Sequence, residues 1–336
     1  MPLNFFKKFF LRFDFVLRKM FSKIILIRKI YSIIMAILVE IQVRINNKII
    51  IIFDCKSSPP TYGDYVSFIF LARLIIAKKK DVEILIINGN YRKDWEILKN
   101  PNYFINDLIK ISNSYTYENC AKIISWNDFK NISRNHSKQI IFFNKINNRY
   151  RIYNQIFNLM QVLYLFNKKI WEEVIIKLKK KDHFTVHLRY SVIGKFYSQE
   201  PTSSRNVVLD DAKQVIEYLT KKHHDLKCII VTDKDGMDYF YNLKKISKNV
   251  LFSKEISDTF YEDTQLIFSS QYYYVYKGGG ISVFTFFSDV DFIIGTDPFH
   301  ELFWNKKKMK LMSWSNKNQK VITNMTLKKF FSIEFN

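Results

Sequence analysis

Basic side chains gather around the carboxyl end of a short apolar run in the middle of the chain. In "HFTVHLRYSVIGKFYSQEPTSSRNVVLDDA", residues 183–212, His187 and Arg189 lie in or directly after the run, and Arg205 follows across a polar loop. A guanidinium group can grip a phosphate through two parallel hydrogen bonds. We therefore expect Arg189 and Arg205 to bind a diphosphate at the end of a buried strand.

A glycine-rich stretch, "KGGGIS", offers a second phosphate contact. Gly278, Gly279 and Gly280 are three of the eight glycines in the chain. Such a segment lets backbone N–H groups approach phosphate oxygens, and Ser282 adds a donor. The other interpretation is a tight turn that needs positive φ angles. The stretch is neither a Walker-type P-loop nor a GxGxxG fingerprint.

Asp64 is a candidate substrate-handling residue. It follows Gly63 in "KSSPPTYGD", a loop between the apolar run "NNKIIIIFDC" and a segment of helical length. In parallel sheets, groups at this kind of junction handle substrate. Asp64 also fits the N-cap of the helix that follows, where it would accept bonds from first-turn amides. Both roles are open from the sequence.

The elements that position these groups alternate between strand and helix. One series starts at residue 46 and a second at residue 183, while the region between them predicts helices over 92–100 and 154–181 and a strand over 138–144. This alternation predicts an α/β fold of two doubly wound, Rossmann-like domains facing a cleft. We expect a basic amphipathic membrane-proximal segment (1–45), an N-terminal Rossmann-like domain (46–180), a C-terminal Rossmann-like domain (181–322) and a C-terminal helix or tail (323–336).

Composition indicates a folded protein with phosphate-rich partners. The 336 residues are 48% hydrophobic, and 53 Lys and Arg against 31 Asp and Glu give a net charge of +22. That charge favours nucleic acid, anionic lipid or nucleotide-linked substrates, although an AT-rich genome would also produce it. Cys55, Cys120 and Cys228 are far apart without a CxxC pair, which predicts a reducing compartment and small buried apolar residues.

The first 45 residues mix apolar and basic side chains. The longest uncharged run, Ile30–Val39, has 10 residues, too few for the roughly 20 that span a bilayer. A helix here would lie on an anionic membrane surface or dock on the protein's own core. The first alternative predicts a cytoplasmic protein, peripheral on the inner face of the membrane. The basic residues are Lys7, Lys8, Arg12, Arg18, Lys19, Lys23, Arg28 and Lys29.

Several short motifs together resemble a known family. "VHLRY", "IIVTDKD", "LFSKE", "DTQLIFSSQ" and the Gly/Ser-rich turn, within residues 183–295, are similar to the carboxyl-terminal domain of GT-B glycosyltransferases, in particular those related to the O- and α-1,6-fucosyltransferases. The resemblance implies that Arg189 binds the β-phosphate of a sugar nucleotide. It implies that four further residues lie near the nucleotide, and Tyr190 stands where the family has a second arginine. Those four residues are His187, Thr232, Asp233 and Ser282.

A second resemblance concerns the first half. "TYGDYVSFIFLARLI" looks like the start of the acceptor domain in heptosyltransferase-like GT-B enzymes, which implies Asp64 as the base. Together the resemblances imply an inverting, metal-independent glycosyltransferase without a cofactor. It would move a sugar from a nucleotide-diphosphate donor, with GDP-linked donors among the candidates. We expect the acceptor to be a surface or lipid-linked glycan in cell-envelope polysaccharide biosynthesis, because a basic amphipathic N-terminus would hold the enzyme where such substrates are.

Three alternatives compete with this interpretation. Asp289 and Asp291 form a DxD arrangement, which in GT-A glycosyltransferases holds a divalent metal; its place after two αβ series favours a loop before the strand "FIIG". A nucleic-acid-binding protein would suit the charge, but no helix-turn-helix, zinc site or RNP-like strand is recognisable, so we expect no nucleic-acid partner. A catalytically silent membrane-associated protein with the same fold is the third.

Overall fold

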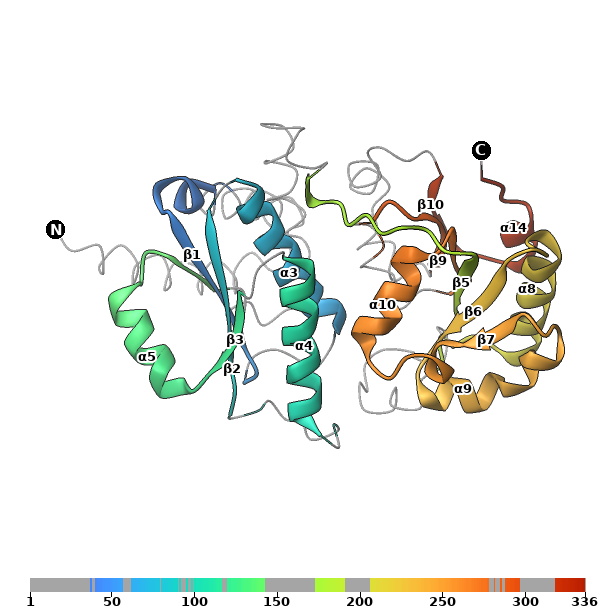
Figure 1. Ribbon diagram of the computed structural model, residues 1–336, viewed down its shortest axis with the longest axis horizontal. Coiled ribbons are helices and arrows are strands. Elements are labelled where there is room, and N and C mark those ends of the chain that lie inside the picture. The colour runs from blue at the N-terminus through green and yellow to red at the C-terminus, as the bar shows by residue number, and fades with distance from the viewer. Residues whose placement is uncertain are drawn as a thin grey trace, which may run out of the picture.

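The computed structural model shows two α/β halves that lie side by side (Figure 1). Both halves are built on parallel sheets, compatible with Rossmann-like domains, and the predicted α/β class is confirmed. The structure describes residues 37, 40–56, 62–78, 80–89, 91, 95, 98, 100–116, 120–142, 173–190, 206–277, 281, 285, 288–296 and 318–335.

The first sheet has four strands among the described residues, in the order β3-β2-β1-β4, all parallel. In the central strand β1, the run from Ile49 to Phe53 is buried. A parallel strand covered on both faces needs no polar alternation, so a continuous β-branched run suits this place. The strands are β1 (Lys48–Asp54), β2 (Asp81–Ile87), β3 (Ala121–Ile124) and β4 (Ile140–Phe142).

The second sheet has six strands in the part of the chain that the structure describes, in the order β10-β9-β8-β5-β6-β7, again all parallel. Read from β7, this is the doubly wound 3-2-1-4-5-6 order. The order reverses between β5 and β8, and we call the carboxyl ends of these two strands the switch point. The strands are β5 (His183–His187), β6 (Lys227–Val231), β7 (Val250–Phe252), β8 (Tyr272–Val275), β9 (Asp291–Thr296) and β10 (Gln319–Thr323).

Helices cover both faces of each sheet. α3 and α4 cover the inner face of the first sheet and α5 its outer face, while α10 covers the inner face of the second sheet and α8, α9 and α14 its outer face. The helices are α3 (Tyr62–Ala77), α4 (Pro101–Tyr115), α5 (Trp126–Asn135), α8 (Leu209–Lys222), α9 (Lys234–Phe240), α10 (Phe260–Ser269) and α14 (Leu327–Phe331), with short 3-10 turns at Tyr241–Lys245 and Ser253–Glu255.

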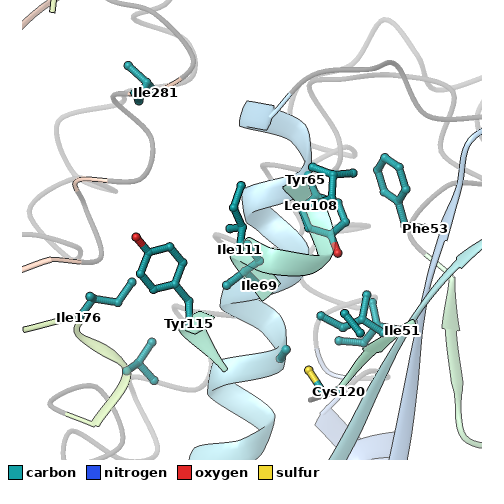
Figure 2. Close-up of a cluster of buried hydrophobic side chains, with 14 of the residues drawn as sticks. Ile51, Phe53, Tyr65, Ile69, Leu108, Ile111, Tyr115, Cys120, Ile176 and Ile281 are labelled. Carbon is teal, nitrogen blue, oxygen red and sulfur yellow. The ribbon is translucent and has the colours of Figure 1, made fainter. Parts of the chain in front are cut away.

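The inner faces of the two sheets share one hydrophobic cluster. It joins Ile51 of β1 and Ile111 of α4 to Phe268 of α10 and Phe292 of β9. Figure 2 shows Tyr115 of α4 directed towards the segment that carries Ile176. Within the described residues, the two halves are therefore packed as one body through their inner helices rather than around two separate cores.

α4 and α10 run in the same direction along this junction (Figure 1). Asp107, in the first half of α4, meets the backbone N–H of Phe260 at the start of α10. Tyr115, at the end of α4, meets Thr264 and Gln265 further along α10. Helices of parallel αβ units run against their strands. The carboxyl edges of both sheets therefore face the same side of the molecule.

The end of the N-terminal segment docks on the first half. Residues 40–45 are helical, and Gln42 Nε2 donates to the carbonyl of Lys138 at 2.8 Å. Glu40 is buried and forms an ion pair with Lys78 at the end of α3. For this part of the segment, the docked alternative is the one that the structure shows.

The outward side of the same helix carries three exposed isoleucines beside the exposed Arg44. Ile37, Ile41 and Ile45 follow one another at helical spacing and are exposed, Ile45 to 73%. Residues 1–36 lie outside the described residues. Among the helices that are described, none has the length and apolar character to cross a membrane.

Most predicted elements of both series are present, but the region between them differs. The strand predicted over 138–144 is β4, whereas α4, β3 and α5 were not predicted. The helix predicted over 92–100 lies mostly outside the described residues. The helix predicted over 154–181 is outside them as far as residue 172, and residues 175–181 are not helical.

Candidate functional site

The switch point of the second sheet carries one cation on each of its two strands. β5 and β8 pair up to His187 and Val275. Arg189 follows two residues after His187, and Lys277 two residues after Val275. In open parallel sheets, ligands bind outside the carboxyl ends of the strands where the order reverses. This is the position at which a phosphate-containing ligand is expected.

His187 is a neutral side chain at this edge. Its Nδ1 lies 3.0 Å from the carbonyl oxygen of Val231, the last residue of β6, so Nδ1 carries the proton and donates it. Burial lowers the pKa of His187 to about 4, and the charge of Arg189 acts in the same direction. At neutral pH the ring therefore carries no charge and contributes to a phosphate site only by hydrogen bonding.

Arg189 lies on the face of the sheet that α10 covers. Phe184, Leu188 and Tyr190 of the same run pack into the outer cluster, so strand alternation turns Arg189 to the opposite, inner face. Its backbone carbonyl accepts a bond from the N–H of Val207 at 2.9 Å. The guanidinium is partly enclosed, with Nη1 buried. The cation is therefore directed to the side where the first half of the molecule lies.

The turn after β6 brings Thr232 and Asp233 to the same edge. Asp233 is the N-cap of α9, and its Oδ1 accepts from the N–H of Gly236 at 2.8 Å. A Cβ atom on Gly236 would lie 1.9 Å from Oγ1 of Thr232. Only glycine allows this close approach, which keeps Thr232 buried beneath the helix. Capping of α9 thus explains Asp233 without a ligand.

Tyr190 stacks on Tyr239 of α9, with ring centroids 4.1 Å apart and an interplanar angle of 10°. Tyr190 is partly buried against the outer cluster, and Tyr239 is exposed. The position that holds a second arginine in the resembled fucosyltransferases is thus occupied by an aromatic stack on the outer face. This residue brings no charge to the switch point.

Lys277 was not singled out by the sequence, although it directly precedes the glycine triplet. Its Nζ lies 3.8 Å from Oδ2 of Asp211 in the first turn of α8. Asp211 also acts on Tyr276, whose pKa is raised to about 12 by burial, by the Asp211 charge and by a hydrogen bond to it. The signal that could have found Lys277 is its place at the end of β8, but only strand order makes that place informative.

Asp64 is the third residue of α3, because the helix begins at Tyr62. It therefore lies in the first turn of the helix, neither in the preceding loop nor at the N-cap position. α3 follows β1, whose partner β4 stands on the far side of the order reversal in the first sheet. Asp64 thus occupies the matching switch point of the first half. The structure describes the backbone of Gly63 and Asp64 here.

Other predicted site residues lie outside the described residues. These are Arg205, Gly278, Gly279, Gly280 and Ser282.

The DxD aspartates belong to the opposite edge of the second sheet. Asp291 is the first residue of β9, at its amino end, and its Oδ2 accepts from Asn318 at 3.0 Å. Asp289 pairs with Lys180 at 2.9 Å. Asp289 lies in the loop before the strand, as predicted, whereas Asp291 is already part of the strand. In the described part of the chain, no group of His, Cys, Asp or Glu could hold a metal ion.

The three cysteines are buried, as predicted for small apolar residues. Burial raises the pKa of Cys55 to about 12 and also raises the pKa of Cys228. Both thiols are therefore protonated at neutral pH.

Comparison with protein-family models, with curated proteins and with solved structures finds no match to this chain. Fold and site together define an α/β protein with two parallel sheets, the second of which reverses its strand order at a cationic edge.

Proposed function

We propose that this protein is a GT-B-type glycosyltransferase that moves a sugar from a nucleotide-diphosphate donor to a hydroxyl of a surface or lipid-linked glycan. The observation that carries the proposal is the placement of Arg189 at the order reversal of a 3-2-1-4-5-6 sheet. A diphosphate at this edge would meet a guanidinium that cannot lose its charge. The fucosyltransferase-like motifs lead to the same residue.

In this proposal the donor binds on the second half and the acceptor on the first. The carboxyl edges of both sheets face the same side, so Arg189 and Asp64 act on the same side of the molecule. Arg189, with Arg205 and the Gly278–Ser282 segment, offsets the charge that develops on the departing diphosphate. Asp64 takes the proton of the attacking hydroxyl. The positive end of the α3 dipole stabilises the carboxylate that a base requires.

Transfer is proposed to be inverting and independent of a metal. Arginine and backbone N–H groups neutralise the diphosphate in place of a divalent ion. The aspartates that would bind such an ion in a GT-A enzyme are at the amino edge, where Lys180 and Asn318 contact them. A GDP-linked donor is one candidate, since the resemblance is to enzymes that use it.

The N-terminal segment is proposed to hold the protein on the inner face of the membrane. The basic residues before position 30 supply attraction to anionic lipid, and the exposed Ile37, Ile41 and Ile45 supply an apolar strip. Co-sedimentation with anionic vesicles should fall as salt rises and should be lost when residues 1–45 are deleted. Equal sedimentation of the truncated protein would overturn this part of the proposal.

The experiment for the main proposal is a thermal-shift series with purified protein and five nucleoside diphosphates (UDP, GDP, ADP, CDP and TDP), followed by hydrolysis of the matching nucleotide sugars in EDTA. Stabilisation by one or two of the nucleotides and turnover in EDTA are expected. Absence of any shift, together with salt-sensitive binding to single- or double-stranded nucleic acid, would instead support the nucleic-acid-binding alternative.

A further inference from the structure

Lys277 occupies the strand end opposite Arg189 at the switch point. Arg189 and Lys277 each lie two residues beyond the last paired positions of β5 and β8, His187 and Val275. Paired strands are about 4.8 Å apart, so the two backbones leave the sheet in adjacent positions. Two cationic side chains therefore start from neighbouring strands at the same edge.

The ammonium group of Lys277 is oriented but loosely held. Its Nζ is 3.8 Å from Oδ2 of Asp211 and 5.4 Å from the centre of the Tyr276 ring, and the side chain is 30% exposed. Lys254, in the same half, forms a tighter and more buried ion pair. Its Nζ lies 2.7 Å from Oδ2 of Asp263, and its side chain is 11% exposed. Lys277 therefore keeps N–H donors free to meet a ligand.

We infer that Lys277 is the second cation of a pyrophosphate clamp, which binds two linked phosphates between the ends of β5 and β8 together with Arg189. Lys277 moves from Asp211 to the phosphate when the ligand enters, and Asp211 orients it in the meantime. The identification of the ligand as a diphosphate rests on the proposed function. The clamp itself rests on the register of β5 and β8 and on the contacts of Lys277.

Titration calorimetry with inorganic pyrophosphate at low salt tests the clamp, with orthophosphate as the comparison. Lys277→Ala should weaken pyrophosphate binding by roughly tenfold, the scale of one lost charge-assisted contact. Asp211→Asn should tighten binding by a few fold, about the effect of removing one nearby negative charge in a hydrated setting. Lys277→Arg should keep binding within a few fold of the wild type.

Lys213→Ala is the matched control, because it removes one positive charge from α8 at a side chain that is 62% exposed. It should leave pyrophosphate binding unchanged. If Lys277 served only to pair with Asp211, Lys277→Ala and Asp211→Asn would both reduce stability slightly and neither would change binding. Equal binding by the wild type and Lys277→Ala, with both folded by circular dichroism, overturns the clamp.

The same measurements separate the clamp from the proposed function. Lys277-dependent pyrophosphate binding without turnover of any nucleotide sugar retains the clamp and rejects the transferase. If Lys277→Ala turns over a nucleotide sugar at the wild-type rate, the proposed transferase function stands and the clamp is rejected. A wild-type protein that binds neither pyrophosphate nor a nucleoside diphosphate rejects both.

Discussion

Asp107 of α4 accepts a hydrogen bond at 3.2 Å from the backbone N–H of Phe260, the first residue of α10. The same carboxylate oxygen accepts from Tyr62 Oη at 2.8 Å. The Tyr62 and Phe260 rings stack with centroids 3.9 Å apart. The beginnings of α3 and α10 thus meet the middle of α4 at one buried carboxylate, which fixes the first half against the second.

Replacing Asp107 should loosen this junction. Asp107→Ala leaves the Tyr62 hydroxyl and the Phe260 N–H without their acceptor, and we expect it to lower the free energy of unfolding by about 2–3 kcal/mol. Asp107→Asn keeps an acceptor oxygen and should cost less. Chemical denaturation measures both, with Asn106→Ala, an exposed neighbour on the same helix, as the control. A loss no larger than that of the control would contradict this role for Asp107.

The close approach at Gly236 gives a second stability prediction. Gly236→Ala places a methyl group 1.9 Å from Thr232 Oγ1, and we expect a loss of about 2–4 kcal/mol from the forced shift of α9. Thr232→Ala removes the nearest atom, so the double variant should lose less than the sum by about 1–2 kcal/mol. Asp235→Ala, exposed in the same helix, is the control. Additive losses would show that the two residues do not press on each other.

Buried strands were recognisable from the sequence. β1 and β5 were predicted because strands covered on both faces are continuous apolar runs. α4 was missed because "PNYFINDLIKISNSY" contains three Asn and two Ser, poor helix formers. Its helix is stabilised instead by tertiary burial of Phe104, Ile105, Leu108 and Ile111. Propensity and packing disagree there, and packing wins.

The candidate site was also predictable only in part. Arg189 was predicted because a strand end can be recognised locally. Lys277 became significant only once β8 was seen to pair with β5, with β6 and β7 on the other side of β5. Strand order depends on contacts between distant segments, and neither composition nor periodicity reports it. The segment "TDKDG" carries the local signal for an N-cap at Asp233. The sequence analysis instead predicted that Asp233 lies near the nucleotide.

Acid should destabilise the protein through His187. Its pKa is about 4 in the folded state against 6.5 ordinarily, so between these values the unfolded chain binds more protons. Stability from this group is complete above pH 6.5 and falls as the pH drops towards 4, by up to about 3 kcal/mol. His223, whose pKa burial also lowers to about 4, adds to the effect.

His187→Asn tests this origin, because the asparagine amide can still donate to the Val231 carbonyl but does not titrate. The free energy of unfolding, measured from pH 7 to pH 4, should fall less steeply in this variant than in the wild type. His224→Asn, at an exposed histidine, is the matched control and should keep the wild-type slope. Identical slopes in all three proteins would remove His187 as a source of acid sensitivity.

Arg189→Ala tests whether Arg189 binds the donor diphosphate. Because Arg189 is proposed to contact the diphosphate before and during transfer, with a stronger bond as charge develops, both nucleotide affinity and kcat should fall. We expect about a tenfold loss in affinity, the scale of one charge-assisted contact. Arg134→Ala on the exposed face of α5 removes the same charge away from the site and should change neither. An unchanged nucleotide affinity would exclude Arg189 from the donor site.

Asp64→Asn tests whether Asp64, in the first half, is the general base of the proposed transfer. Asn keeps the shape of the side chain but cannot accept the proton, so turnover should fall by roughly 100-fold or more, the scale of a lost general base. Nucleotide affinity should stay the same, since the donor binds on the other half. An N-cap would tolerate Asn with a loss of a few tenths of a kcal/mol, but α3 begins two residues earlier, at Tyr62. Near-normal turnover in a folded Asp64→Asn protein would reject Asp64 as the base and make Glu200 the next carboxylate to replace.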